Sequence, residues 1–80
     1  MTTFPISMLA AAAVNGATVE LAHVGQTFRL VVTDGGVIQD DLTRYFGQDR
    51  EADDAYDWTV GQLRGGHDLD WLRLRSAVAA

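Results

Sequence analysis

The sequence predicts an α+β fold, in which a small antiparallel sheet packs with helices. Residues 17–33 alternate apolar and polar side chains with the period of two that half-buried strands show. Residues 50–64 repeat their apolar side chains with the helical period instead. The chain has 80 residues, of which 48% are hydrophobic, so it can bury one small core. We therefore expect a single domain over residues 1–80.

The N-terminal segment, FPISMLAAAAV at residues 4–14, is predicted to be a helix. Its four consecutive alanines are strong helix formers. Thr3 suits an N-cap, Pro5 suits the first turn, and Asn15–Gly16 supplies a stop. The segment is not read as a signal peptide, because it lacks a positively charged beginning and Pro5 interrupts its apolar run.

A β-hairpin is predicted over about residues 17–33, with Gly25–Gln26 as its two-residue loop. The pairs that follow from this loop are Val19 with Val32, Leu21 with Leu30, and His23 with Phe28. The apolar side chains of the first strand then lie on the same face of the hairpin as those of the second strand. A slip of one residue would place them on opposite faces. The DGG sequence at residues 34–36 ends the second strand.

Two helices are expected after the hairpin. A short one over about residues 40–47 is capped by Asp40 or Asp41 and ended by Gly47. A longer one over about residues 50–64 ends at the GG sequence of residues 65–66. Its side chains within one arc of about 100° on the helical wheel form a core-facing stripe. They are Ala52, Tyr56, Thr59, Val60 and Leu63.

The C-terminal tail is predicted to be a third strand over about residues 69–76. Leu72 and Leu74 alternate there with two arginines, as in a strand with one apolar face. The alternative is a helix that begins at Asp68.

The net charge of −5 lies in one segment. Residues 40–57 contain seven acids and two arginines, whereas acids and arginines balance in the rest of the chain. The pI of about 4.6 and the scarcity of neighbouring arginines argue against direct nucleic-acid binding. The acidic balance favours basic partners, and the simple alternative is that it only keeps the protein in solution.

Cysteine is absent, which excludes disulfides and thiolate metal sites and fits a reducing cytoplasm. No apolar run reaches the roughly 18 residues that a membrane span requires.

No motif indicates catalysis or a cofactor. Ser7 and Ser76 lack the sequence context of a nucleophile, and the chain has no phosphate-binding glycine loop. A general acid needs partial burial, whereas the acids of this chain are predicted to face solvent. We therefore expect no enzyme and no cofactor.

The two histidines give no strong metal signal. His23 lies on the apolar face of the predicted hairpin, where a structural role is expected. His67, Asp68 and Asp70 are close in sequence and suit a metal ion, but the two acids serve equally well in a turn and a helix cap. The sequence predicts no metal site.

The acidic segment is better read as a partner-binding surface. If residues 40–57 were all helical, they would span about 27 Å, with roughly one carboxylate per 4 Å. One DNA strand carries a phosphate about every 3.4 Å, so the segment partly mimics one strand. Trp58 lies opposite the core stripe and is a candidate anchor, unless the tail or residues 40–47 cover it. The candidate partner-binding residues are Asp40, Asp41, Tyr45, Asp49, Glu51, Asp53, Asp54, Asp57 and Trp58.

The whole chain resembles a known class in its profile: its length, its lack of cysteine, its mixed patterning and the acidic, aromatic stretch QDDLTRYFGQDREADDAYDW. It is similar in these respects to the small acidic anti-CRISPR proteins of phages and mobile elements, especially those against type I-C systems. The resemblance implies a non-catalytic inhibitor that binds a CRISPR surveillance complex in the cytoplasm of a bacterial host and blocks its engagement of target DNA. We expect a monomer rather than an oligomer.

A second resemblance concerns the N-terminal part. The stretch PISMLAAAAVNGATVEL, followed by a hairpin, is similar to the beginning of some antitoxins that repress their own operon. It implies an alternative function, the binding of a toxin or of operator DNA. The DNA part of that function needs a basic surface, for which the sequence offers little basis.

Overall fold

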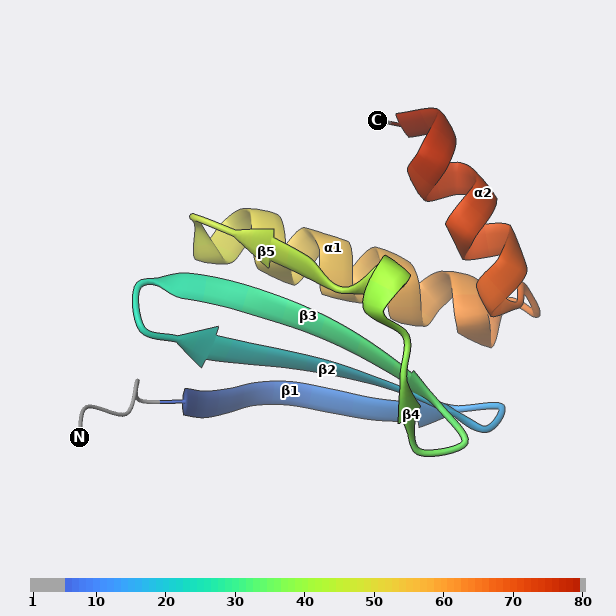
Figure 1. Ribbon diagram of the computed structural model, residues 1–80, viewed down its shortest axis with the longest axis horizontal. Coiled ribbons are helices and arrows are strands. Elements are labelled where there is room, and N and C mark those ends of the chain that lie inside the picture. The colour runs from blue at the N-terminus through green and yellow to red at the C-terminus, as the bar shows by residue number, and fades with distance from the viewer. Residues whose placement is uncertain (1–5, 80) are drawn as a thin grey trace.

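Residues 6–79 form a five-stranded antiparallel sheet packed with two α-helices, so the predicted α+β class is confirmed; Figure 1 shows the helices on one side of the sheet. The computed structural model describes the backbone of residues 6–79 and the side chains of residues 6–75. The elements are β1 (Ile6–Val14), β2 (Ala17–Val24), β3 (Thr27–Asp34), β4 (Val37–Ile38), a 3₁₀ turn η1 (Asp40–Leu42), β5 (Arg44–Phe46), α1 (Asp49–Arg64) and α2 (Leu69–Ala79).

Three long strands, β1, β2 and β3, form a meander, and two short ones, β4 and β5, join it within residues 6–79. β4 pairs with one end of β3 and β5 pairs with the other end. α1 packs against β2 and β3, with β5 beside it, whereas α2 leaves the body of the fold next to η1 (Figure 1). The core therefore lies between α1 and one face of the meander.

The predicted hairpin is confirmed, with the predicted register between β2 and β3. Gly25 begins its loop with a φ of 62°, a left-handed conformation that two-residue hairpin loops require and glycine adopts without strain. The paired side chains that this register buries form the centre of the core. They are Val19, Leu21, Leu30 and Val32.

The prediction of a helix over residues 4–14 is wrong, because residues 6–14 form the strand β1, antiparallel to β2. Thr3 and Pro5, its predicted cap and first turn, lie outside the described residues. Alanine's helix propensity is worth less than about 1 kcal/mol per residue, and pairing with the edge of β2 outweighs it.

Asn15–Gly16 is a hairpin turn and not a helix stop. Both residues have positive φ, 52° and 84°, as a type I′ turn requires. The Asn15 side-chain amide also donates a hydrogen bond to the Leu63 carbonyl (3.3 Å), which ties this turn to the end of α1.

The prediction of a helix over residues 40–47 is also wrong. The segment forms η1 and then β5, in which Tyr45 pairs with Arg29 and Phe46 with Phe28. An eight-residue helix is marginal by itself, whereas β5 gains backbone hydrogen bonds from the free edge of β3. Leu42, at the end of η1, is buried in the core.

The predicted helix over residues 50–64 is confirmed as α1, which begins one residue earlier. The predicted stripe faces the sheet, with Tyr56 partly buried and the other four members buried. The hydroxyl of Thr59, the one polar member that is buried, donates a hydrogen bond to the Ala55 carbonyl (2.8 Å).

The prediction of a strand over residues 69–76 is wrong, and the alternative of a helix beginning at Asp68 is confirmed. The Asp68 carboxylate accepts a hydrogen bond from the Trp71 backbone N–H (2.9 Å), which is the geometry of an N-cap. A strand would place Leu72 and Leu74 on one face, whereas the helix buries Leu72 and leaves Leu74 68% exposed. Among the described residues, no helix is long and apolar enough to cross a membrane.

The Leu21→Ala substitution is expected to destabilise the protein by roughly 2–5 kcal/mol, because it leaves a cavity under α1. Urea denaturation followed by far-UV circular dichroism measures the change. The matched control, Leu74→Ala, removes an exposed leucine and is expected to change the free energy of unfolding by less than about 0.5 kcal/mol. Equal losses in both variants would contradict the assignment of the core.

Candidate functional site

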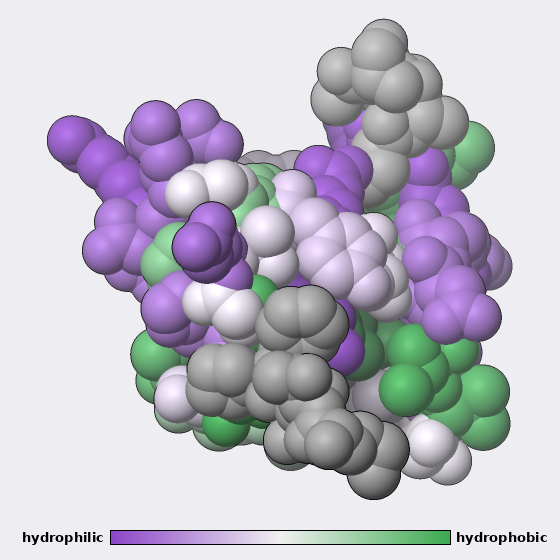
Figure 2. All heavy atoms as spheres, turned by 60° about the vertical axis from the view of Figure 1, so that its left-hand side comes forward, coloured by the Kyte–Doolittle hydropathy of each residue, from purple (hydrophilic) through white to green (hydrophobic). Residues whose placement is uncertain are grey.

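The five predicted acids of α1, Asp49, Glu51, Asp53, Asp54 and Asp57, are all exposed. We call these five exposed residues the acidic face of α1, although Asp49, in the first turn, is in line with the stripe that packs on the sheet. Figure 2 shows hydrophilic side chains mostly on the side of the molecule where β5 and α1 lie, and hydrophobic ones mostly over the strands. In the described part of the chain, the ion pairs are those of Arg73, so none involves the acidic face.

The members of the acidic face differ in their local role. Asp49 and Glu51 lie in the first turn of α1, where they complement the positive end of the helix dipole. Asp53, Asp54 and Asp57 lie beyond that turn and have no such compensation. These three carboxylates have no ion-pair partner within the described residues, and in this sense their negative charge is unbalanced.

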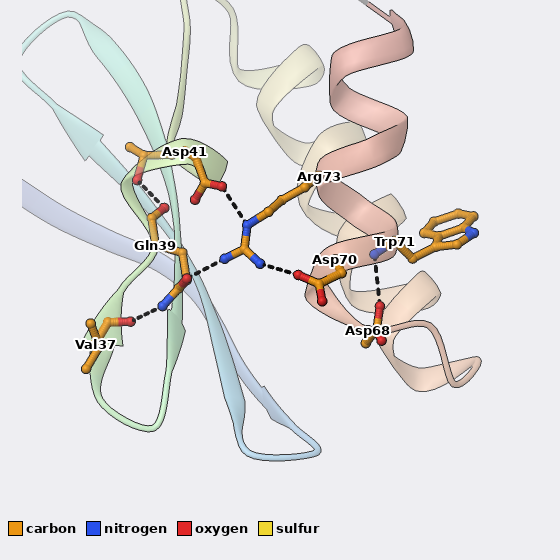
Figure 3. A network of polar contacts seen from close by, with 8 residues as sticks. Val37, Gln39, Asp41, Asp68, Asp70, Trp71 and Arg73 are labelled. Atoms are coloured by element: carbon orange, nitrogen blue, oxygen red, sulfur yellow. Dashed lines mark hydrogen bonds and ion pairs between the residues drawn. The ribbon is translucent and has the colours of Figure 1, made fainter.

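Asp41 is not part of this face, because Arg73 of α2 pairs with its carboxylate and neutralises it (Figure 3). The Arg73 Nε donates to the Asp41 carboxylate at 2.5 Å, and another guanidinium nitrogen donates to Asp70 at 2.7 Å. A third hydrogen bond joins Arg73 to the side-chain oxygen of Gln39. Arg73 thus connects α2 to η1 and to the residue before it.

These contacts keep Arg73 charged. The hydrogen bond to Asp41 raises the pKa of Arg73 above its ordinary value, the hydrogen bond to Asp70 raises it further, and a partial loss of solvation opposes both. The guanidinium is therefore positive at any pH at which binding would be measured.

Asp40 and Tyr45 lie on the other side of the sheet. Tyr45 pairs with Arg29, whose side chain is on the face that α1 does not cover, and Asp40 lines a shallow hollow on that same face. Both side chains are exposed. The nine predicted residues thus do not form one surface: six lie on α1, one is neutralised, and two lie on the opposite face.

Trp58 is both exposed and supported by α2. It is 46% exposed, and its ring stacks on Trp71 with 5.9 Å between ring centres. Trp71 is also stacked by His67 at 3.8 Å, and the Arg75 guanidinium lies 5.1 Å from its ring centre. The tail therefore covers one side of Trp58, as the alternative interpretation of the sequence expected, while the rest of the ring remains accessible.

A groove of about 590 Å³ lies beside Trp58, between the sheet, α1 and α2. Its lining is mostly apolar. The residues that line it are Leu30, Val32, Leu42, Ala55, Trp58, Thr59 and Leu72, with the charged Arg44, Asp54 and Arg75. The sequence did not predict this groove, because it forms only if the tail is a helix. The signal that would have indicated it is the cap at Asp68.

The described residues contain no group of three or more histidines or acids placed to hold a metal ion. The residues that the sequence singled out have other contacts: His67 stacks on Trp71, Asp68 caps α2, and Asp70 pairs with Arg73. What the site offers chemically is a fixed negative charge beside an accessible aromatic ring.

The Arg73→Gln substitution is expected to loosen α2 and reduce the stacking of Trp58 on Trp71. Stacked indoles give a coupled circular dichroism signal, which should weaken in this variant. The control Arg64→Gln removes an exposed arginine at the end of α1 and should leave the signal unchanged. An undiminished signal in Arg73→Gln would show that Arg73 does not hold α2 in place.

No protein-family model, curated protein or solved structure matches this chain.

Proposed function

We propose that the protein is a non-catalytic inhibitor whose acidic face occupies a cationic, nucleic-acid-binding groove on a partner and thereby blocks the engagement of target DNA. The observation that carries this proposal is that Asp53, Asp54 and Asp57 are exposed without an ion-pair partner among the described residues, on the helix that also presents the half-exposed Trp58. The partner that we assign is a CRISPR surveillance complex of type I-C, in the cytoplasm of a bacterial host. This assignment is supported by the resemblance of the whole chain to small acidic anti-CRISPR proteins.

The spacing of the carboxylates supports the mimicry of one nucleic-acid strand. Asp49, Asp53 and Asp57 follow one another at intervals of four residues, a rise of about 6 Å per interval along the helix axis. Along the duplex axis, alternate phosphates of one DNA strand are about 7 Å apart. A row of arginines or lysines that contacts alternate phosphates would therefore find carboxylates at similar positions.

The rigidity of α1 contributes to the affinity of such a complex. Its buried stripe fixes the helix on the sheet, so the carboxylates are held in place before the partner arrives and little conformational entropy is lost on binding. The negative charge would also steer the encounter with a basic surface.

Trp58 supplies the apolar part of the interface. Interface anchors are typically large aromatic side chains at the centre of a contact, with charges at the rim. Here Trp58 borders a mostly apolar groove, and Asp54 lines the same groove. An apolar side chain of the partner would enter this groove while its basic side chains meet the acidic face.

Neutralising the three unbalanced acids, in the variant Asp53→Asn, Asp54→Asn and Asp57→Asn, should raise the concentration for half-maximal inhibition by about tenfold or more. The measurement is target-DNA binding by a purified type I-C surveillance complex, followed by electrophoretic mobility shift. Asparagine keeps the side-chain size, so the fold is expected to be retained.

The matched control removes the same amount of charge from other parts of the surface, in the variant Glu20→Gln, Asp34→Asn and Asp40→Asn. It should inhibit nearly as well as the unmodified protein. Equal inhibition by both variants would contradict the role of the acidic face, and an unmodified protein that does not inhibit would contradict the choice of partner.

A further inference from the structure

β1 forms one edge of the sheet and pairs with β2 on one side only. Within residues 6–79, no strand pairs with its other side. This side presents a row of backbone N–H and C=O groups over a strand of nine residues. The opposite edge of the sheet differs, because β3 is covered at its two ends by β4 and β5.

The edge lacks most of the features that prevent strands from pairing with other chains. Proteins protect such edges with charged residues, prolines, bulges or very short strands. Residues 6–14 contain no charged residue and no proline. Leu9 forms an irregularity in the pairing, but Ala10–Val14 pair with β2 without interruption. These five residues are therefore a regular, uncharged template for another strand.

Apolar side chains are exposed at the same edge. Ile6 is 59% exposed, Met8 is 56% exposed and Leu9 is 50% exposed, and all three belong to β1. Exposed large hydrophobic side chains that lie close to one another typically mark a surface that another molecule covers.

We propose that β1 pairs with β1 of a second copy of this chain, antiparallel and around a two-fold axis near Ala12. This register places Ala12 opposite its own counterpart, Ala10 opposite Val14, and Ala11 opposite Ala13. Residues that are directly opposite share a face of the sheet. The two sheets therefore join into one continuous sheet, and both α1 helices lie on the same face of it. The two-fold symmetry closes the assembly at two copies.

Charge favours a second copy over a basic partner at this edge. Two chains of net charge −5 repel each other, and the uncharged β1 is where they can meet without bringing acids together. Figure 1 shows β1 at one side of the sheet, away from β5 and η1. A cationic partner gains nothing from a strand that carries no charge.

The geometry at the ends of the strand also suits self-pairing. With the axis near Ala12, Leu9 of each copy lies opposite Asn15 of the other and Met8 lies opposite Gly16, so these two exposed side chains meet the partner's turn, whereas Ile6 extends past it. The acidic face of α1 stays accessible in the dimer, so this inference does not rest on the proposed function.

Analytical ultracentrifugation of the intact chain tests the proposal. Between about 10 μM and 1 mM, the unmodified protein should change from one chain to two, with twice the 8.7 kDa mass of one chain. The variant Ala11→Lys with Ala13→Lys adds charges at two exposed edge positions and should weaken dimerisation at least tenfold.

The control variant Gln26→Lys with Gln48→Lys makes the same change of net charge at exposed positions away from β1 and should dimerise like the unmodified protein. A chain that is monomeric over the whole concentration range would overturn the proposal. So would an Ala11→Lys, Ala13→Lys variant that dimerises as well as the control.

Disulfide trapping tests the register without lysines. The chain has no cysteine, so Ala12→Cys introduces the only thiol. Directly opposite Cα atoms in antiparallel strands are about 4.5–5.5 Å apart, which a disulfide can span. Mild oxidation should convert Ala12→Cys into a covalent dimer and leave Gln26→Cys, in the β2–β3 loop, mostly monomeric. The reverse outcome, or equal trapping at both positions, would overturn the proposed axis.

Discussion

The register between β2 and β3 determines where the charged surfaces of this protein lie. It places Val19, Leu21, Leu30 and Val32 on one face of the sheet, and these four side chains are almost completely buried. The buried stripe of α1 packs on that face. Because α1 has only one apolar stripe, burying it fixes the rotation of the helix and turns its acids outward. A slip of one residue in the hairpin would remove this surface.

The elements that were predictable from the sequence are those with a strong local period. The hairpin alternates over both strands, and α1 repeats its apolar positions over four turns. β1 and β5 were mistaken for helices, because their strand state depends on the free edges of β2 and β3, which are distant in sequence. For β1, the Asn15–Gly16 pair fits both a helix stop and a hairpin turn, and only the pairing partner distinguishes them.

The candidate site shows the same division between local and distant contacts. The exposure of Asp53, Asp54 and Asp57 follows from the helical wheel alone. The neutralisation of Asp41 does not, because its partner Arg73 is 32 residues away and faces η1 only if the tail is a helix. The same helix brings Trp71 onto Trp58 and forms the groove. In the proposed dimer, the β1 edges would meet while each acidic face remains free to bind.

The salt dependence of binding tests most directly whether unbalanced carboxylates carry the interaction. Isothermal titration of the purified type I-C surveillance complex should show the affinity of the unmodified protein falling at least about tenfold between roughly 50 and 400 mM NaCl, since salt screens exposed charges. The variant Asp53→Asn, Asp54→Asn, Asp57→Asn should bind more weakly and depend much less on salt. An unmodified protein whose affinity does not change with salt, or a variant that keeps the same salt dependence, would contradict the account.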